Sequence, residues 1–217
     1  NTMLKSYSIL SAAIILLCAS SVVQAQDAIT NFAVEYTVTG DNPTVNNTDG
    51  DFLSYSYKDS KMSMILVNKM VDLKMVYDGE AKKGILLNSM QSGATKIASL
   101  LNEKALAHDN SNVVVSDLEG SKRILGYKCS KAQVTLKDKT IDVWYAPKLK
   151  PYNFDFEGYF FSQLDGFPLM MVETSKDGVL TSTATKVSLD LADNVFDQKV
   201  PQGYKTISFE QLNGGKK

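Results

Sequence analysis

Apolar and polar residues alternate with a period of two along most of the chain beyond residue 30. In the first such segment Phe32, Val34, Tyr36 and Val38 share one side, and Ala, Glu and Thr residues lie between them. This alternation is typical of a β-strand with one buried face. Comparable alternating or apolar runs occur at residues 52–57, 62–66, 71–77, 85–87, 123–127, 132–136, 141–145, 168–174 and 179–191. Turn residues separate them, so the pattern predicts about nine or ten mostly antiparallel strands.

One stretch departs from the period of two. Residues 95–107 contain no Gly or Pro, and Ile97, Leu101 and Ala105 follow one another at a spacing of four. This spacing predicts an amphipathic helix with Thr95 near its N-cap. No charge run or composition shift marks a linker, so we expect one domain of mainly β (α+β) class. A single antiparallel sheet of this length must curl, close or be covered, and we expect a curved sheet with one or two helices covering its concave face.

The first 25 residues have the features of an export signal. Lys5 precedes an almost uncharged stretch at residues 9–23, and small or β-branched residues stand just before Gln26. This arrangement is typical of a secretory signal peptide cleaved after Ala25. The apolar stretch is shorter than the roughly 20 residues that a membrane-spanning helix needs. We therefore expect a signal peptide at 1–25, a single domain at 26–217, a periplasmic or secreted location, and no transmembrane span after cleavage.

Charge and composition exclude several classes of function. The formal net charge is −1, with 23 basic and 24 acidic residues. Arg123 is the only arginine, whereas proteins that bind nucleic acids normally carry a basic excess with several arginines. There is also one histidine, His108, and no nucleophile elbow, P-loop or dinucleotide fingerprint. We expect no nucleic-acid partner, no metal, no cofactor and no enzymatic activity.

The chain has two cysteines, and the sequence assigns neither a chemical role. Cys18 lies inside the predicted signal peptide and follows Leu17, whereas lipid attachment calls for a small residue there. Cleavage would leave Cys129 as the only thiol, without a disulfide partner. A catalytic thiol needs a base, and nothing brings His108 close to it. We expect Cys129 to be buried and unreactive, and His108 to end the predicted helix.

Methionine is the residue that most suggests a ligand. Seven of the eight methionines follow residue 25, and several alternate with other apolar residues. Methionine is flexible and polarisable and recurs on surfaces that accept varied apolar ligands. The methionines could line a cavity for a lipid or acyl chain, or they could simply fill the core. The candidate lining residues are Met62, Met64, Met75, Trp144, Phe160 and Met170.

An aromatic segment between Pro151 and Phe161 is open to two interpretations as well. It is rich in Phe and Tyr and is interrupted by Asp, Glu and Gly. It could cover a cavity as a lid, or it could pack down and fill the concave face. Nearby, Trp144 and Tyr145 are adjacent and must face opposite sides of a strand.

Several short motifs together resemble a known group of proteins. The motifs are Gly126-Tyr127-Lys128-Cys129-Ser130-Lys131-Ala132, Val143-Trp144-Tyr145-Ala146, Asp165-Gly166-Phe167-Pro168-Leu169 and the closing stretch from Phe196 to Lys205. They resemble secreted Bacteroidetes domains of unknown function related to outer-membrane lipoprotein-sorting (LolA-like) proteins, and more weakly the GLPGLI-type family. The resemblance implies an unclosed half-barrel of antiparallel strands covered by helices. Its cavity would take lipids or the acyl chains of lipoproteins, and the resemblance supplies no catalytic residues.

Two functions follow from these observations. The first is an exported cell-envelope protein that binds an apolar ligand in the cavity of a half-barrel, without catalysis. The alternative is a structural or protein-interaction module with a filled interior and no ligand. An apolar cavity of about 300–1,000 Å³ would favour the first, and a packed interior the second.

Overall fold

The computed structural model describes residues 27–40, 51–90, 95–106, 113–136, 139–154, 160–176 and 178–212. Within these ranges twelve strands form a single sheet. Their bounds are β1 Phe32–Gly40, β2 Phe52–Lys58, β3 Lys61–Val67, β4 Val71–Asp78, β5 Lys83–Met90, β6 Lys96–Asn102, β7 Val114–Ile124, β8 Tyr127–Leu136, β9 Lys139–Ala146, β10 Phe167–Ser175, β11 Gly178–Ser188 and β12 Lys205–Ser208. The expected mainly β fold is therefore confirmed.

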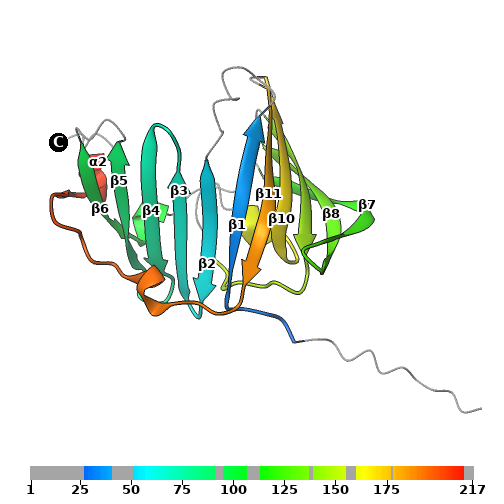
Figure 1. Cartoon of the computed structure of the whole chain (residues 1–217), viewed down its shortest axis with the longest axis horizontal. Helices are drawn as coiled ribbons and strands as arrows, with labels where there is room; N and C mark the ends of the chain where they lie inside the picture. Colours follow the sequence, from blue (N-terminus) through cyan, green and yellow to red (C-terminus); the bar gives the residue numbers. More distant parts are fainter. Residues whose placement is uncertain are drawn as a thin grey trace, which may run out of the picture.

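The sheet is curved and unclosed (Figure 1). Its strand order is β12-β6-β5-β4-β3-β2-β1-β11-β10-β9-β8-β7, so β12 and β7 form its two edges. Within the described ranges every paired strand is antiparallel to its neighbour except β12, which runs parallel to β6. Most neighbours are consecutive in the chain, as short hairpin turns require. After β6 the chain passes to β7 at the opposite edge and returns strand by strand to β11, which pairs with β1, so β1 lies in the middle of the sheet.

The alternation read from the sequence defines the inner, concave face. Phe32, Val34 and Tyr36 of β1 are buried on this face. In β2 they lie opposite Tyr57, Tyr55 and Leu53 respectively, which extends the apolar surface across the strands. Because residues paired across an antiparallel ladder share a face, the register carries this surface onward through β3, β4 and β5. The main core lies here, inside the curve of the sheet.

The predicted helix at residues 95–107 is wrong. Residues 96–102 form β6, and only the four residues Glu103–Leu106 are helical (α1). A spacing of four is an even number, so Ile97 and Leu101 share one face of a strand as well as one face of a helix. Side chains on both faces of β6 are buried, Leu101 on the inner face and Ala98 on the outer face. Two-sided contact favours a strand at this place.

The expectation that helices cover the concave face is also wrong. Apart from α1, the only α-helix in the described ranges is α2 (Phe209–Leu212), which is four residues long as well. The segment between β9 and β10, which contains the short 3-10 turn η2 (Phe160–Gln163), lies inside the curve instead (Figure 1). Aromatic side chains of this segment, rather than a helix, fill much of the concave face.

The outer face carries a second, smaller core. Val76, Ile85, Leu87 and Ala98 point outward from β4, β5 and β6 and pack with Phe196. Phe196 ends the 3-10 turn η3 (Asp193–Phe196), which the chain forms after it leaves β11. An ion pair of 2.6 Å between the Lys58 Nζ and an Asp193 carboxylate oxygen fixes this turn to the sheet. The C-terminal part of the chain thus crosses the outer face before β12 joins β6 (Figure 1).

Several predictions concern residues outside the described ranges. The signal peptide at 1–25 and His108 lie there, so they stay predictions. Among the described residues, no helix has the length and apolar character required to span a bilayer.

Candidate functional site

A cluster of aromatic rings occupies the middle of the concave face. We call it the aromatic cluster; its members are Phe32, Tyr55, Tyr57, Phe154, Phe160, Phe161 and Phe167. The Phe167 ring lies at its centre, with ring centroids of Phe32, Tyr57 and Phe161 each 5.2 Å away. These pairs are edge-to-face, the arrangement that the quadrupoles of aromatic rings favour. Part of the interior is therefore packed.

Local contacts hold the segment that supplies these rings. The Tyr36 hydroxyl donates a hydrogen bond of 2.5 Å to the Pro168 carbonyl, which fixes the start of β10 against β1. Gly166 precedes β10 with a positive φ of 154°, and a Cβ at this position would collide with the Ala146 carbonyl. Only glycine permits this close approach of the two backbones. The segment therefore enters β10 in a fixed direction, with Phe167 turned into the core.

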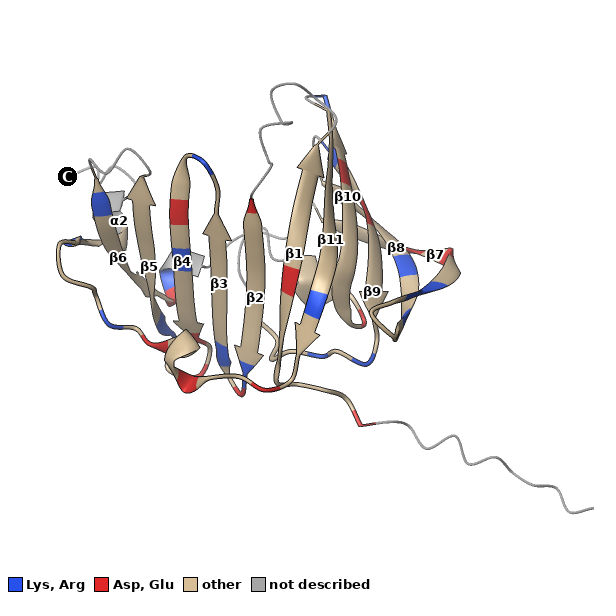
Figure 2. Cartoon of the chain, viewed as in Figure 1, with Lys and Arg blue, Asp and Glu red and all other residues tan. Residues whose placement is uncertain are grey.

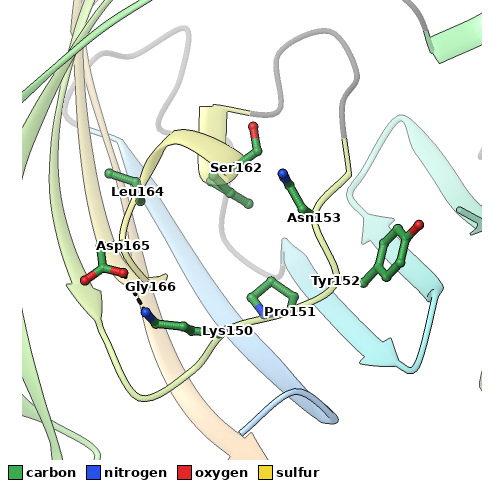
Figure 3. A pocket seen from close by; sticks show the side chains of 9 residues that line it. Lys150, Pro151, Tyr152, Asn153, Ser162, Leu164, Asp165 and Gly166 are labelled. Atoms are coloured by element: carbon green, nitrogen blue, oxygen red, sulfur yellow. Dashed lines mark hydrogen bonds and ion pairs between the residues drawn. The ribbon is translucent and has the colours of Figure 1, made fainter. Parts of the chain in front are cut away.

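A small hollow lies between the two arms of this segment (Figure 3). Its volume is about 140 Å³. Lys150 and Asp165 point toward one another at one side of it and form an ion pair of 2.6 Å. Asn153 and Ser162 line another side. The hollow is too small for an acyl chain, so it does not match the predicted cavity.

A larger hollow lies beyond Phe161 on the same face; we call it the apolar hollow. Its volume is about 330 Å³, at the lower end of the range typical of ligand sites. It is lined by Tyr55, Leu136, Lys139, Ile141, Phe160, Phe161, Met171, Glu173, Leu180 and Ser182. Phe161 also lines the small hollow beside Lys150 and Asp165, so this residue borders both hollows. The apolar hollow offers a mainly apolar surface with a few polar groups.

The apolar hollow is lined by two kinds of polar group, a partly exposed ion pair and a buried tyrosine hydroxyl. Lys139 and Glu173 form an ion pair of 2.9 Å, and both side chains are about one-third exposed. Burial raises the pKa of Tyr55 to about 12, so its phenol is neutral at physiological pH. No described residue hydrogen-bonds to the Tyr55 hydroxyl, although the ring contacts Tyr36, Phe161 and Phe167. The lining therefore contains one neutral hydroxyl with spare hydrogen-bonding capacity.

Three of the predicted lining residues share the inner face of β3 and β4. Met62 is fully buried in the core, and Met64 lies between Tyr55 and Met75 in the strand register. None of these three methionines lines the apolar hollow. Met62 and Met75 belong to the main core, and Met64 packs against it. A ligand-binding role for them stays a prediction.

The other three predicted residues are divided between the two faces. Phe160 lines the apolar hollow. Trp144 and Met170 are cross-strand partners on the outer face, where the Lys122 Nζ lies 4.5 Å from the Trp144 ring centroid and 2.9 Å from the Met170 Sδ. Met171, which follows Met170 in the chain, faces the hollow instead. Met170 and Met171 are adjacent and therefore face opposite sides of β10, but the sequence does not show which side is the inner one.

Cys129 is free and fully buried. Its Sγ lies 3.6 Å from the Tyr127 carbonyl oxygen, and burial raises the pKa of the thiol. Both features oppose formation of the reactive thiolate. Its predicted lack of reactivity fits this setting and awaits measurement. Within the described part of the chain, no three His, Cys, Asp or Glu side chains gather as metal ligands would.

Comparison with known proteins identifies related sequences and folds. Residues 34–153 match the model of the family described as "N-glycanase peptide, N-terminal domain". The PNGF-II structure in its P21 crystal form is similar with a TM-score of 0.52 and 14% identity; the match covers 86% of this chain and 33% of that one. A β-barrel-like protein of the domain of unknown function DUF1849 from Brucella abortus gives a TM-score of 0.42 at 10% identity, covering 77% of this chain and all (100%) of the other. The lipoprotein LppX of Mycobacterium tuberculosis gives 0.37 at 11% identity, with 76% and 89% covered.

The likeness to PNGF-II shows a shared fold, and this chain spans about a third of the length of that protein. The other two scores are too low to support an argument. No curated protein matches the chain. The family match overturns the resemblance to lipoprotein-sorting proteins and to the GLPGLI-type family. The motifs that suggested it lie on the turn before β8 and the first half of β8, on β9, at the start of β10, and between η3 and β12. Such turn and packing residues serve any curved antiparallel sheet, which explains why they misled.

Proposed function

We propose, from the premise that this chain belongs to the N-glycanase peptide N-terminal domain family, that the domain binds an apolar ligand without catalysing a reaction. The observation that carries the proposal is the apolar hollow of about 330 Å³ beside Phe161 on the concave face. A lipid, an acyl chain or an apolar side chain of a larger molecule has the chemistry to enter it.

The lining supports this proposal in two ways. Ile141, Met171 and Leu180 present aliphatic and thioether surface, and a ligand that covers this surface removes it from water. Methionine adapts to ligands of different shape because its side chain has three rotatable bonds. The Tyr55 hydroxyl and the Lys139–Glu173 ion pair offer polar contacts that would orient the polar end of a ligand.

The proposal is tested by titrating the protein with a neutral fluorescent apolar probe, N-phenyl-naphthylamine. Met171→Trp places a larger side chain in the hollow and is expected to weaken probe binding about tenfold or more, which corresponds to roughly 1.4 kcal/mol. Met170→Trp is the matched control, because Met170 lies next in the chain and faces the opposite side of the sheet. The control is expected to bind the probe as the wild type does.

Two outcomes would contradict this function. A wild type that binds no probe would leave the hollow without a ligand role. Equal weakening by Met170→Trp and Met171→Trp would show that the effect does not come from the hollow. Thermal melting of each variant distinguishes loss of the site from loss of the fold.

A second function, a protein-interaction module, is favoured by the aromatic cluster and by the family. Phe154, Phe160 and Phe161 already fill the middle of the concave face. We propose for this case that the domain accompanies the catalytic part of an N-glycanase-like protein and positions it or its substrate. A wild type without probe binding that associates with such a catalytic part in analytical ultracentrifugation would favour this second function over the first.

Export remains part of the proposal. The signal features at residues 1–25 are the only support for a periplasmic or secreted location. Intact-mass measurement of protein recovered after expression in a secreting host tests it. A product that begins at Gln26 is expected, whereas a product retaining residues 1–25 would contradict export by cleavage.

A further inference from the structure

A separate and larger hollow lies at the end of the sheet where β11 ends and β7 turns into β8; we call it the basic hollow. Its volume is about 690 Å³. Three cationic side chains line it, from Arg123, Lys128 and Lys148. It shares no lining residue with the apolar hollow. Its function is therefore independent of the one proposed above.

The charge of the basic hollow is one-sided. Among the residues that the structure describes, no Asp or Glu lines it, although Asp27 and Asp190 are close in sequence to two lining residues. Arg123, the only arginine of the chain, uses one guanidinium N–H in a hydrogen bond of 3.0 Å to the Gly126 carbonyl. That bond fixes the guanidinium beside the turn, and a guanidinium has further N–H donors for a carboxylate or phosphate. Figure 2 shows Lys and Arg on β7 and β8 at this side of the sheet.

Apolar side chains stand beside these cations. Leu125 and Leu189 both line the basic hollow and are 46% and 56% exposed. Leu125 has a φ of 49°, a left-handed conformation that leucine rarely adopts. Leu125 and Gly126 (φ 85°) are the two central residues of the hairpin turn between β7 and β8, and this kind of turn requires a positive φ at both positions. The hairpin therefore holds an exposed leucine beside an arginine.

The backbone around the basic hollow is held in place. The Ile29 N–H donates a hydrogen bond of 2.8 Å to the Lys148 carbonyl, and the Lys150 N–H donates one of 2.9 Å to the Ile29 carbonyl. These bonds pair the segment before β1 with the segment after β9 as a short parallel bridge. The cations and leucines are therefore presented on a fixed frame, which lowers the entropic cost of binding.

We propose that the basic hollow binds a small anionic amphiphile. Its carboxylate or phosphate group lies among Arg123, Lys128 and Lys148, and its apolar part covers Leu125 and Leu189. Charge-assisted hydrogen bonds hold the head group, and burial of the exposed leucines adds the apolar contribution. Neither a purely inorganic anion nor a neutral apolar molecule satisfies both halves of the site.

Calorimetric titration of the full chain with monomeric decyl phosphate tests the proposal. Decyl phosphate is expected to bind, whereas inorganic phosphate and decyltrimethylammonium, which lack the chain or the negative charge, are expected to bind at least about tenfold more weakly. The affinity should fall as salt concentration rises, because salt screens exposed charges. Equal binding of all three probes would overturn the proposal.

Three variants locate the site. Arg123→Gln and Lys128→Gln are expected to weaken decyl phosphate binding about tenfold, and the control Lys83→Gln, an exposed lysine of β5 outside the hollow, less than about twofold. Leu125→Gly removes the apolar side chain and suits the positive φ, so the fold is retained. It should weaken decyl phosphate and leave inorganic phosphate unchanged. No loss in Arg123→Gln and Lys128→Gln would overturn the proposal.

The source of the anion is resolved with vesicles of phosphatidylcholine and phosphatidylglycerol. Binding of monomeric decyl phosphate without co-sedimentation supports a single-molecule site. Co-sedimentation without binding of the monomer would overturn it in favour of a membrane surface. Because N-phenyl-naphthylamine is neutral, its binding to the apolar hollow should survive Arg123→Gln, so failure of this proposal and failure of the proposed function are distinguishable.

Discussion

The aromatic cluster and the apolar hollow lie side by side on the same face of one sheet, yet one is filled and the other is not. In the cluster, Phe167 is fully buried and touches rings from β1, β2 and the segment before β10. In the hollow, Ile141, Met171 and Leu180 surround about 330 Å³ that no described side chain fills. Phe160 and Phe161 belong to both regions.

The difference lies in where the segment between β9 and β10 places its aromatic rings. Close contact on all sides gives a central ring such as Phe167 its full dispersion energy. The atoms that line the hollow lack partners on one side, so the same kind of residue contributes less to stability there. We therefore expect the aromatic cluster to contribute most of the stability of the concave face. We expect the apolar hollow to be the part of that face that binds a ligand.

The strongest test of this comparison removes the centre of the cluster. Phe167→Ala is expected to lower the free energy of unfolding by about 3–5 kcal/mol, because it leaves a cavity among four rings. Phe52→Ala is the control, since Phe52 is an exposed phenylalanine at the start of β2; it should cost less than about 1 kcal/mol. Urea unfolding measures both. If Phe167→Ala lowered the free energy of unfolding by less than about 1 kcal/mol, the aromatic cluster would not be a main source of stability.

Alkaline pH tests the burial of Tyr55, which borders both regions. Burial raises the pKa of Tyr55 from its ordinary value of 10.0 to about 12 in the folded protein. The folded state keeps the proton more firmly, so this stabilising contribution is complete below pH 10 and is lost as the pH rises toward 12. The loss is on the order of 2 kcal/mol.

The measurement for Tyr55 is urea unfolding at several pH values. The variant Tyr55→Phe cannot ionise at this position and should lose less stability than the wild type between pH 10 and pH 12. Tyrosine absorbance should also show one phenol fewer ionising late in the variant. Identical pH profiles for the two proteins would refute the burial argument.

Overpacking separates the filled region from the hollow. Met62→Trp enlarges a fully buried side chain and is expected to cost roughly 1–3 kcal/mol. Met171→Trp has space to occupy in the hollow and is expected to cost less than about 1 kcal/mol. Thermal melting of the two variants gives the comparison. Equal destabilisation would mean that the hollow is closed in solution.

The smallest effect is expected at the edge of the hollow. Glu173→Gln removes the ion pair with Lys139, whose partners are about one-third exposed, and should change stability by only about 0.2–1 kcal/mol. The change should shrink as salt concentration rises. Chemical unfolding at low and high salt measures it, and a large salt-independent loss would show that the pair is structural.

Much of the fold could be predicted from the sequence, because period-two alternation reports directly which strand residues share a face. The alternation of Phe32, Val34 and Tyr36 and the turn signals between the runs predicted a mainly antiparallel sheet correctly. The predicted helix at residues 95–107 is wrong for a physical reason. Ile97 and Leu101 share a face both in a helix and in a strand, so their spacing does not distinguish the two. The burial of Ala98 on the outer face favours the strand.

The candidate site was predicted less well than the sheet. The sequence singled out Phe160, which lines the apolar hollow, but it named Met170 rather than Met171 and could not separate Met62 from the lining; a ligand-binding role for any of these residues stays a prediction. Phe167, Leu169 and Met171 alternate inward along β10, but the sequence did not show which side of this strand faces the core.

The sequence by itself determined the class of the fold and the aromatic content of the segment before β10, whereas the run at residues 123–127, expected as a strand, contains the turn between β7 and β8. These are local properties, set by side-chain period and turn chemistry. Only the tertiary structure decided that the aromatic rings fill the middle of the concave face, that a hollow remains beyond Phe161, and that Arg123 and Lys148 line one hollow. Each of these depends on contacts between residues far apart in the chain, which the strand order and the curvature of the sheet bring together.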